Sequence, residues 1–175
     1  MHKNINLEDI ISELKEENHT RFDDLYKATK NQIYYTIIAI LKDKSLAEDA
    51  MQDTYLKILR NISSYKPKTN PMAWMVMIAR NTALNIYNKR KRETLISPDE
   101  MTILAQEDEM KPTPLLDLMY QVLKPREREL IIMHIINGMT HKQIARLLKR
   151  PLGTVLWQYN RAIKKLRAKA GELNV

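Results

Sequence analysis

Hydrophobic residues recur every three or four positions along most of this 175-residue chain, a spacing that predicts amphipathic helices. The clearest example begins at Pro125, a residue suited to the first turn of a helix. It continues through Ile131, Ile132, Ile135 and Ile136. Asn137-Gly138 then ends the helix, because glycine tolerates the left-handed backbone of a C-terminal cap.

Two further helices are predicted after this turn. Thr140 and Gln143 have the spacing of a capping box, in which each side chain satisfies a backbone amide near the other. A break at 150–153 precedes the last helix, for which Thr154 is the expected N-cap and Lys169 the approximate end. A short helix, a turn and a longer basic helix predict a helix-turn-helix that enters the major groove of DNA. The alternative is a basic hairpin whose charges only confer solubility; agreement of caps, turn and charged face favours DNA binding.

Four helices are predicted in the first half of the chain, over 5–17, 20–41, 45–62 and 72–91. The first belongs to an N-terminal extension, residues 1–19, which we expect to dock on the helices that follow. Thr20 is the expected cap of the second helix, and Ser45 with Glu48 the capping box of the third. The prolines of 63–71 predict a loop before the fourth helix.

Composition excludes several kinds of chemistry. The chain has no cysteine, which rules out disulfides and thiolate sites, and its three glycines leave no glycine-rich phosphate loop. The four histidines are scattered, so we expect no enzyme, no metal and no cofactor. His134 is expected at the core or its edge, and His141 exposed near DNA. No signal-peptide pattern or membrane-spanning apolar run is present, so we expect a cytoplasmic protein without membrane insertion.

Charge divides the chain into three parts. The net charge of +8 is made of +5 for residues 1–92, −5 for 93–111 and +8 for 112–175. A basic protein of this kind is expected to have an acidic partner, most commonly nucleic acid. We therefore predict an all-α fold with two small helical domains, an N-terminal bundle over 20–92 and a helix-turn-helix domain over 112–175. A flexible acidic linker over 93–111 joins them.

Two segments and the helix-turn-helix, in this order, resemble a known family. AEDAMQDTYLKI at 47–58, WMVMIARNTALNIYNKRKR at 74–92 and the C-terminal motif resemble bacterial RNA polymerase sigma factors of the extracytoplasmic-function group, within the sigma-70-like family. The resemblance implies a dissociable, non-catalytic subunit of core RNA polymerase that recognises promoter DNA. It also implies that the N-terminal domain binds the polymerase clamp and the minus-ten element, and the C-terminal domain the minus-thirty-five element and the flap. Most such factors are held inactive by an anti-sigma factor.

The resemblance assigns polymerase binding to Asp49, Gln52 and Asp53. These residues share one helix face, because positions i, i+3 and i+4 are neighbours. A solvated acidic face is the alternative interpretation.

The loop 63–71 and the helix 72–92 match the segment that handles the opened minus-ten element. Opened DNA requires cations for phosphates and surfaces on which bases stack. The expected contacts are Tyr65, Lys66, Arg80, Asn81, Asn85, Lys89 and Arg90, with Lys68, Lys91 and Arg92 adding charge. Trp74 is interpreted as core rather than as a DNA contact. Lys89 to Arg92 has a second interpretation, a solvated helix end favoured by the macrodipole. Many family members have Asp at the position of Asn85, which leaves the role of that side chain open.

In the helix-turn-helix, the family match places five residues at base-reading positions: Thr154, Leu156, Trp157, Gln158 and Arg161. Phosphate contacts are expected from Lys142, Lys149, Arg150, Lys164 and Lys165. Leu156-Trp157-Gln158 stands where relatives often have Lys-Ser-Arg. Apolar contact with thymine methyls and a Gln158–adenine pair predict an A·T-rich upstream element. Alternatively, Leu156 and Trp157 dock on the polymerase flap or on an inhibitor.

Two other classes of function compete with a sigma factor. A helix-turn-helix transcription regulator acting without the polymerase explains the C-terminal motif but leaves the acidic face and linker without a role. A helical adaptor or antagonist predicts no DNA binding. The linker itself is interpreted either as a solvated tether or as a mimic of nucleic acid near the RNA exit path.

Overall fold

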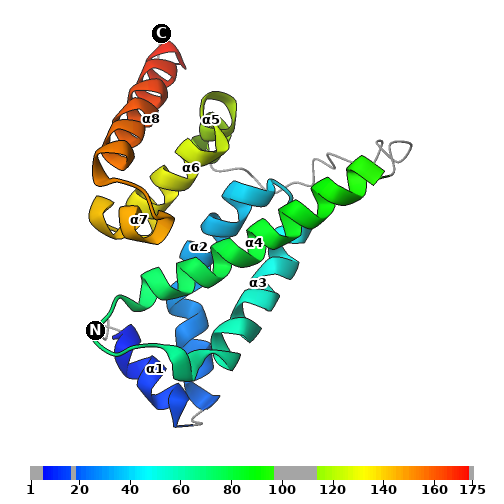
Figure 1. Ribbon diagram of the computed structural model, residues 1–175, viewed down its shortest axis with the longest axis vertical. Helices are drawn as coiled ribbons and strands as arrows, with labels where there is room; N and C mark the ends of the chain where they lie inside the picture. Colours follow the sequence, from blue (N-terminus) through cyan, green and yellow to red (C-terminus); the bar gives the residue numbers. More distant parts are fainter. Residues whose placement is uncertain (1–5, 17–18, 97–113, 174–175) are drawn as a thin grey trace.

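The computed structural model describes residues 6–16, 19–96 and 114–173, and its regular elements in these ranges are all helical (Figure 1). The all-α prediction is confirmed for this part of the chain. The elements are α1 Leu7–Lys15, η1 His19–Arg21, α2 Phe22–Leu41, α3 Lys44–Arg60, η2 Ile62–Ser64, α4 Pro71–Ile96, α5 Pro114–Val122, α6 Pro125–Ile131, the π-helical η4 Ile132–Ile136, α7 His141–Leu148 and α8 Leu152–Leu173.

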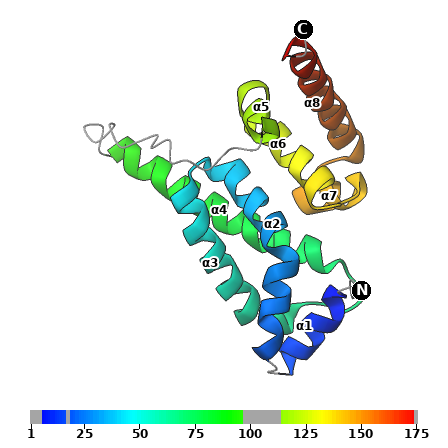
Figure 2. The same cartoon turned by 180° about the vertical axis from the view of Figure 1, so that it is seen from behind.

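Helices α2, α3 and α4 form the N-terminal bundle, in which both α2 and α3 lie against the long α4 (Figures 1 and 2). Their core consists of fully buried aliphatic side chains: Ile33, Ile37, Ala47, Ala50, Ile58, Met75, Ala79 and Ala83. The alanines allow the helix backbones to approach closely. Helix α1 docks on α2 as expected, burying Ile10, Ile11 and Leu14.

The helix starts differ from three predicted caps. The cap of α3 is Asp43, whose carboxylate accepts a hydrogen bond from the Leu46 amide at 2.9 Å. The capping box predicted at Ser45 is therefore wrong, because the extended backbone at Asp43 places a better acceptor one residue before Lys44.

The two other predicted caps lie elsewhere in their turns. Thr20 lies within η1, and α2 begins at Phe22 with Arg21 in the N-cap position. Thr154 lies inside the first turn of α8, because the Val155 amide already donates to the carbonyl oxygen of Pro151 at 3.2 Å. The fixed φ of proline favours this earlier start.

The helix-turn-helix forms as predicted around α7 and α8. Thr140 and Gln143 make the reciprocal capping box, with the Gln143 amide 3.2 Å from Thr140 Oγ1 and the Thr140 amide 2.8 Å from Gln143 Oε1. Gly138 has a φ of +65°, the left-handed conformation expected at the preceding turn.

Helix α4 is longer than predicted and ends at Ile96 rather than near Arg92. Glu93, assigned to the acidic linker, instead continues the helix and lies 3.9 Å from Lys89 one turn earlier. The remainder of the predicted linker, from 97 onward, lies outside the described residues.

The two helical units pack against each other, a contact that the sequence did not predict. Helices α5–α8 lie on one side of α2 and α4, and α3 lies on the other (Figures 1 and 2). Asn137 donates from Nδ2 to Thr36 Oγ1 at 2.9 Å, and the Tyr120 hydroxyl donates to the carbonyl oxygen of Ile38 at 2.8 Å. Buried side chains of α5, α6 and η4 continue the core of the N-terminal bundle.

Candidate nucleic-acid and partner interfaces

The predicted polymerase-binding residues lie on the outer face of α3. Asp49, Gln52 and Asp53 are all exposed, whereas Ala50 and Thr54 face the core. An amide between two carboxylates on a rigid helix suits a partner that presents arginine side chains.

An apolar cavity of about 590 Å³ borders this acidic face. Its lining combines aromatic and aliphatic side chains of α2 and α3 with two polar residues: Phe22, Tyr26, Glu48, Met51, Gln52, Tyr55, Leu56 and Leu59. Burial raises the pKa of Tyr55 to about 12, and its hydroxyl lies 2.8 Å from Thr29 Oγ1. The sequence signal for this surface is Leu56, an exposed apolar residue among the polar positions on the outer side of α3, which the pattern of charges does not reveal.

The loop before α4 brings Tyr65 inward. Its side chain is 3 % exposed, and its hydroxyl donates to the Thr69 carbonyl oxygen at 3.0 Å. In this conformation Tyr65 therefore offers no exposed ring on which a base could stack, and the prediction is corrected on this point. Trp74 is partly buried and packs against the Tyr65 ring, with centroids 5.4 Å apart, in agreement with its interpretation as core. Lys66 and Lys68 remain exposed.

Helix α4 presents an open polar stripe. Asn81, Asn85 and Lys89 follow each other at four-residue intervals and are all exposed. Arg90 is also exposed and lies 3.4 Å from the carboxylate of Asp43.

Arg80 does not belong to the open stripe on α4. Its Nε donates to the Glu129 carboxylate on α6, in a largely buried ion pair between the two helical units. In this arrangement Arg80 is not available to DNA, because tertiary packing has turned it toward the second unit.

The first two turns of α8 expose most of the predicted base-reading residues. Thr154, Leu156 and Trp157 are exposed, and the Trp157 side chain is 59 % exposed. The Arg161 guanidinium lies 5.2 Å from the centre of the Trp157 ring, which is the geometry of a cation–π contact.

Gln158 and the predicted phosphate-binding residues differ in how exposed their side chains are. Gln158 is half-buried, and its Oε1 accepts a hydrogen bond from Arg150 at 3.2 Å. Lys142, Lys149 and Lys164 are exposed.

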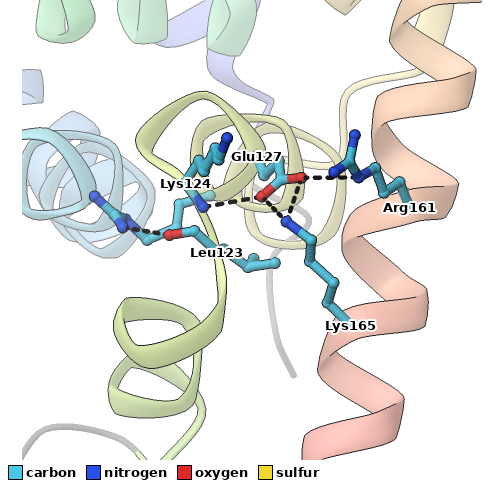
Figure 3. Close-up of polar contacts among 6 residues, drawn as sticks. Leu123, Lys124, Glu127, Arg161 and Lys165 are labelled. Atoms are coloured by element: carbon cyan, nitrogen blue, oxygen red, sulfur yellow. Dashed lines mark hydrogen bonds and ion pairs between the residues drawn. The ribbon is translucent and has the colours of Figure 1, made fainter.

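Sequence reasoning missed Glu127, whose carboxylate contacts Lys124, Arg161 and Lys165 (Figure 3). Its carboxylate accepts the Lys124 amide at 2.9 Å, and Lys165 Nζ at 2.7 and 2.8 Å. Arg161 approaches it to 3.9 Å from the same helix. Lys165 is thus a partly buried anchor between α6 and α8, and its assignment as a phosphate contact is corrected. The Glu127 position, three residues after Lys124 at a helix start, was the available signal.

Electrostatics favour the ionised form of Glu127. Burial by itself raises the pKa of a carboxyl group, but hydrogen bonds from Lys165 and the Lys124 amide, with the charges of Lys165 and Arg161, outweigh it. The pKa of Glu127 is therefore below its ordinary value. The ion pair between Glu127 on α6 and Lys165 on α8 joins these two helices.

Two of the four histidines, His134 and His141, stack on each other inside the helix-turn-helix. The centres of the His134 and His141 rings lie 4.2 Å apart, and each ring makes a T-shaped contact with Tyr159. His134 Nδ1 lies 2.7 Å from the carbonyl oxygen of Met139. The expectation of an exposed His141 beside DNA is wrong, because its ring packs in this cluster. Burial and the neighbouring His134 lower the pKa of His141.

Two further searches concern other kinds of site. Among residues 6–16, 19–96 and 114–173, no three His, Asp or Glu side chains gather as a metal site would require. No helix in the same ranges has both the length and the apolar character needed to cross a bilayer.

Comparison with known families gives two matches in chain order. Residues 25–93 match the model of Sigma-70 region 2, and residues 115–166 match that of Sigma-70, region 4. The first covers α3 and most of α2 and α4, and the second runs from α5 through most of α8.

Similar proteins cover most of the chain. The ECF RNA polymerase sigma factor EcfG of Rhodopseudomonas palustris is 30% identical over 156 residues, 83% of this chain and 82% of its own length. The ECF RNA polymerase sigma factor SigM of Bacillus subtilis is 26% identical over 133 residues, 72% of this chain and 80% of its own length.

A solved structure supports the fold. The sigma factor RpoE of Bartonella quintana, in complex with the anti-sigma factor NepR, has a TM-score of 0.71 at 23% identity, covering 84% of this chain and 94% of that one.

Proposed function

Because the chain belongs to the extracytoplasmic-function group of bacterial RNA polymerase sigma factors, we propose that its exposed helix faces divide the work of such a subunit. As a sigma factor it binds core RNA polymerase and recognises promoters. The observation on which the division rests is the presence of three separate exposed faces on rigid helices: the acidic face of α3, the polar stripe of α4 and the start of α8.

We assign polymerase binding to Asp49, Gln52 and Asp53. The adjacent cavity adds an apolar surface that an incoming helix buries, while the carboxylates select for a basic partner. Because that partner works on chromosomal DNA, the protein acts in the cytoplasm.

We assign the minus-ten element to α4 and its preceding loop. Asn81 and Asn85 offer amides to base edges, and Lys66, Lys89 and Arg90 neutralise phosphates of the opened strand. Arg80 joins them only after its ion pair with Glu129 has opened.

We assign the minus-thirty-five element to the start of α8. Leu156 and Trp157 present apolar surface to thymine methyls, and Gln158, held by Arg150, presents its amide to adenine. An A·T-rich upstream element follows, and selection of a G·C-rich consensus from random duplexes would contradict it.

We also propose regulation by an anti-sigma factor. Structural relatives include a sigma factor crystallised with such a partner. The apolar cavity beside α3 is a suitable surface for it, because occupation there also blocks the acidic face.

Transcription in vitro with purified core polymerase on a genomic DNA library tests the function. We expect starts at discrete sites that share promoter motifs. The double variant Asp49→Asn/Asp53→Asn should lower the affinity for core polymerase about tenfold, the scale of one or two charged contacts at an interface. Asp9→Asn/Glu16→Gln removes one exposed acid of α1 and the exposed acid at its C-cap, and should leave the affinity unchanged.

The runner-up, a helix-turn-helix regulator acting without polymerase, predicts the opposite result. It would bind duplex DNA specifically but show no affinity for the core enzyme and no initiation. The region 2 match does not favour it.

A further inference from the structure

A cavity of about 440 Å³ lies between the two helical units. Its walls come from the C-terminal end of α2, from α4, from the start of α6 and from the residue before Pro151. The lining residues are Ala39, Ile40, Leu41, Lys42, Arg80, Leu84, Tyr87, Pro125, Arg126, Arg128, Glu129 and Arg150. The volume is within the range of pockets that hold small organic ligands, about 300 to 1,000 Å³.

The charge of this lining is unbalanced. Five of its side chains are cationic, and Glu129 is the sole acid among the lining residues. Glu129 is already paired with Arg80. The other four, Lys42, Arg126, Arg128 and Arg150, form no ion pair within the part of the chain that the structure describes.

The buried member of the set is Arg128. Its side chain is 2 % exposed, and its Nε has no hydrogen-bond partner in the described structure. One terminal nitrogen donates to the Leu123 carbonyl oxygen at 2.7 Å, and the guanidinium stacks at 5.0 Å on Tyr120. Lys42 contacts the same ring at 5.3 Å. Burial, and then the neighbouring charge of Arg128, lower the pKa of Lys42.

We propose that this cavity is a binding site for a nucleoside triphosphate. The phosphates are held by Lys42, Arg126 and Arg150 at its walls and by Arg128 at its base. The base stacks on Tyr87, which is 47 % exposed and is the aromatic residue of the lining. Polyphosphate supplies the charge that the lining lacks, and an aromatic ring beside a cationic groove is the combination that binds nucleotides.

The site has a structural consequence, because both units contribute to it. Lys42 and Tyr87 belong to the N-terminal bundle, whereas Arg126, Arg128 and Arg150 belong to the C-terminal unit. A ligand that contacts both stabilises their packed arrangement by mass action. If the proposed function holds, the nucleotide also keeps Arg80 and Arg150 away from promoter DNA. The binding itself does not depend on that function.

Titration calorimetry on the full chain, without polymerase, tests the site with GTP, ATP and inorganic tripolyphosphate. We expect one nucleotide per chain and an affinity at least tenfold above that of tripolyphosphate, because stacking on Tyr87 adds to the phosphate contacts. Tyr87→Ala should remove this preference. Lys42→Ala/Arg126→Ala should weaken nucleotide binding at least tenfold. The matched control Lys27→Ala/Arg167→Ala removes one exposed lysine of the N-terminal bundle and one exposed arginine of the C-terminal unit, both outside the cavity, and should change nucleotide affinity less than twofold.

A single-stranded octanucleotide distinguishes a free nucleotide from nucleic-acid phosphate. The proposal is supported if GTP competes with the octanucleotide for the wild-type chain and this competition is lost in the cavity variants. It is overturned if neither nucleotide binds at millimolar concentration, if control and cavity variants lose affinity equally, or if the octanucleotide alone is affected by the cavity variants.

A distance measurement gives a second and independent readout. Because the chain has no cysteine, Asn88→Cys and Asn160→Cys place unique spin labels on exposed positions of α4 and α8. Saturating GTP should increase the population with the short, packed distance. An unchanged distance distribution would contradict the link between nucleotide and packing.

Discussion

At the scale of single residues, buried ion pairs decide which cations are free to meet DNA. Lys165 and Arg80 both resemble nucleic-acid contacts by charge and position, yet each is turned to a carboxylate, Glu127 and Glu129 respectively. Lys142 is exposed, and Lys89 stays exposed although Glu93 lies 3.9 Å away. The difference follows from neighbours that are distant in sequence.

Glu127→Gln should destabilise the C-terminal unit by about 2 kcal/mol at pH 7, because it leaves Lys165 partly buried without its charged partner. The folded-state pKa of Glu127 is lowered, so its contribution is fully present above the ordinary value of 4.5 and is lost as pH falls below it. Urea unfolding at pH 7 and in acid measures both effects.

The difference between wild type and Glu127→Gln should therefore shrink in acid. Glu172→Gln, on the exposed end of α8, is the control and should cost less than about 0.5 kcal/mol. A penalty for Glu127→Gln that is independent of pH would contradict the electrostatic explanation.

Trp157→Ala should reduce affinity for the upstream promoter duplex about tenfold, the scale of one good base contact. Its indole is exposed, so the free energy of unfolding should change little. Fluorescence anisotropy with duplexes taken from mapped start sites measures the affinity. Asn160→Ala, exposed on the same helix, should be neutral, and equal losses for both variants would exclude a specific role for Trp157.

At the scale of elements, helix starts depend on the best acceptor available in the extended residue before the first turn. Asp43 precedes α3 with φ −132° and ψ 123°, and its carboxylate reaches the Leu46 amide. Ser45 has a favourable residue type for a cap but lies one position inside the helix. Thr154 does not cap α8 for a similar reason, because α8 already begins at Leu152 and Thr154 lies inside its first turn.

Asp43→Ala should therefore destabilise the N-terminal bundle by about 1 kcal/mol, the usual cost of losing an N-cap side chain. Ser45→Ala should be neutral or slightly stabilising, because alanine is the better residue inside a helix. Chemical denaturation of both variants decides between the two caps. A larger cost at Ser45 than at Asp43 would restore the cap that the sequence predicted.

At the scale of the whole molecule, the two helical units are joined by a mixed interface of core packing and buried polar contacts. Tyr120, Asn137 and Glu129 of the C-terminal unit each bond to the N-terminal bundle. The interface hides Arg80, so it must open before Arg80 can join the other proposed minus-ten contacts, which are already exposed. Helix α3, which carries the acidic face, lies on the opposite side of the bundle from the C-terminal unit (Figure 1), and Asp49, Gln52 and Asp53 are exposed.

Glu129→Gln should loosen this interface and raise initiation from a mapped promoter a few-fold at limiting protein concentration, since less free energy is then needed to release Arg80. Run-off transcription with core polymerase measures it. Glu16→Gln, at the exposed C-cap of α1, is the control. Unchanged or reduced initiation would show that the packed arrangement is not a barrier.

The sequence by itself determined the helices, the helix-turn-helix with its Thr140–Gln143 box, and the family. These depend on periodicity, caps and motif order, which are local along the chain. It also indicated the exposed acidic face of Asp49, Gln52 and Asp53, because helical spacing alone separates that face from Ala50 and Thr54.

Only the tertiary structure decided that Tyr65 is buried, that Lys165 and Arg80 are paired, and that a cationic cavity exists between the units. Each of these depends on side chains brought together from positions tens of residues apart. Local patterns specify which face of a helix is apolar, but not which partner covers a given charge, and burial and ion pairing are properties of that partner.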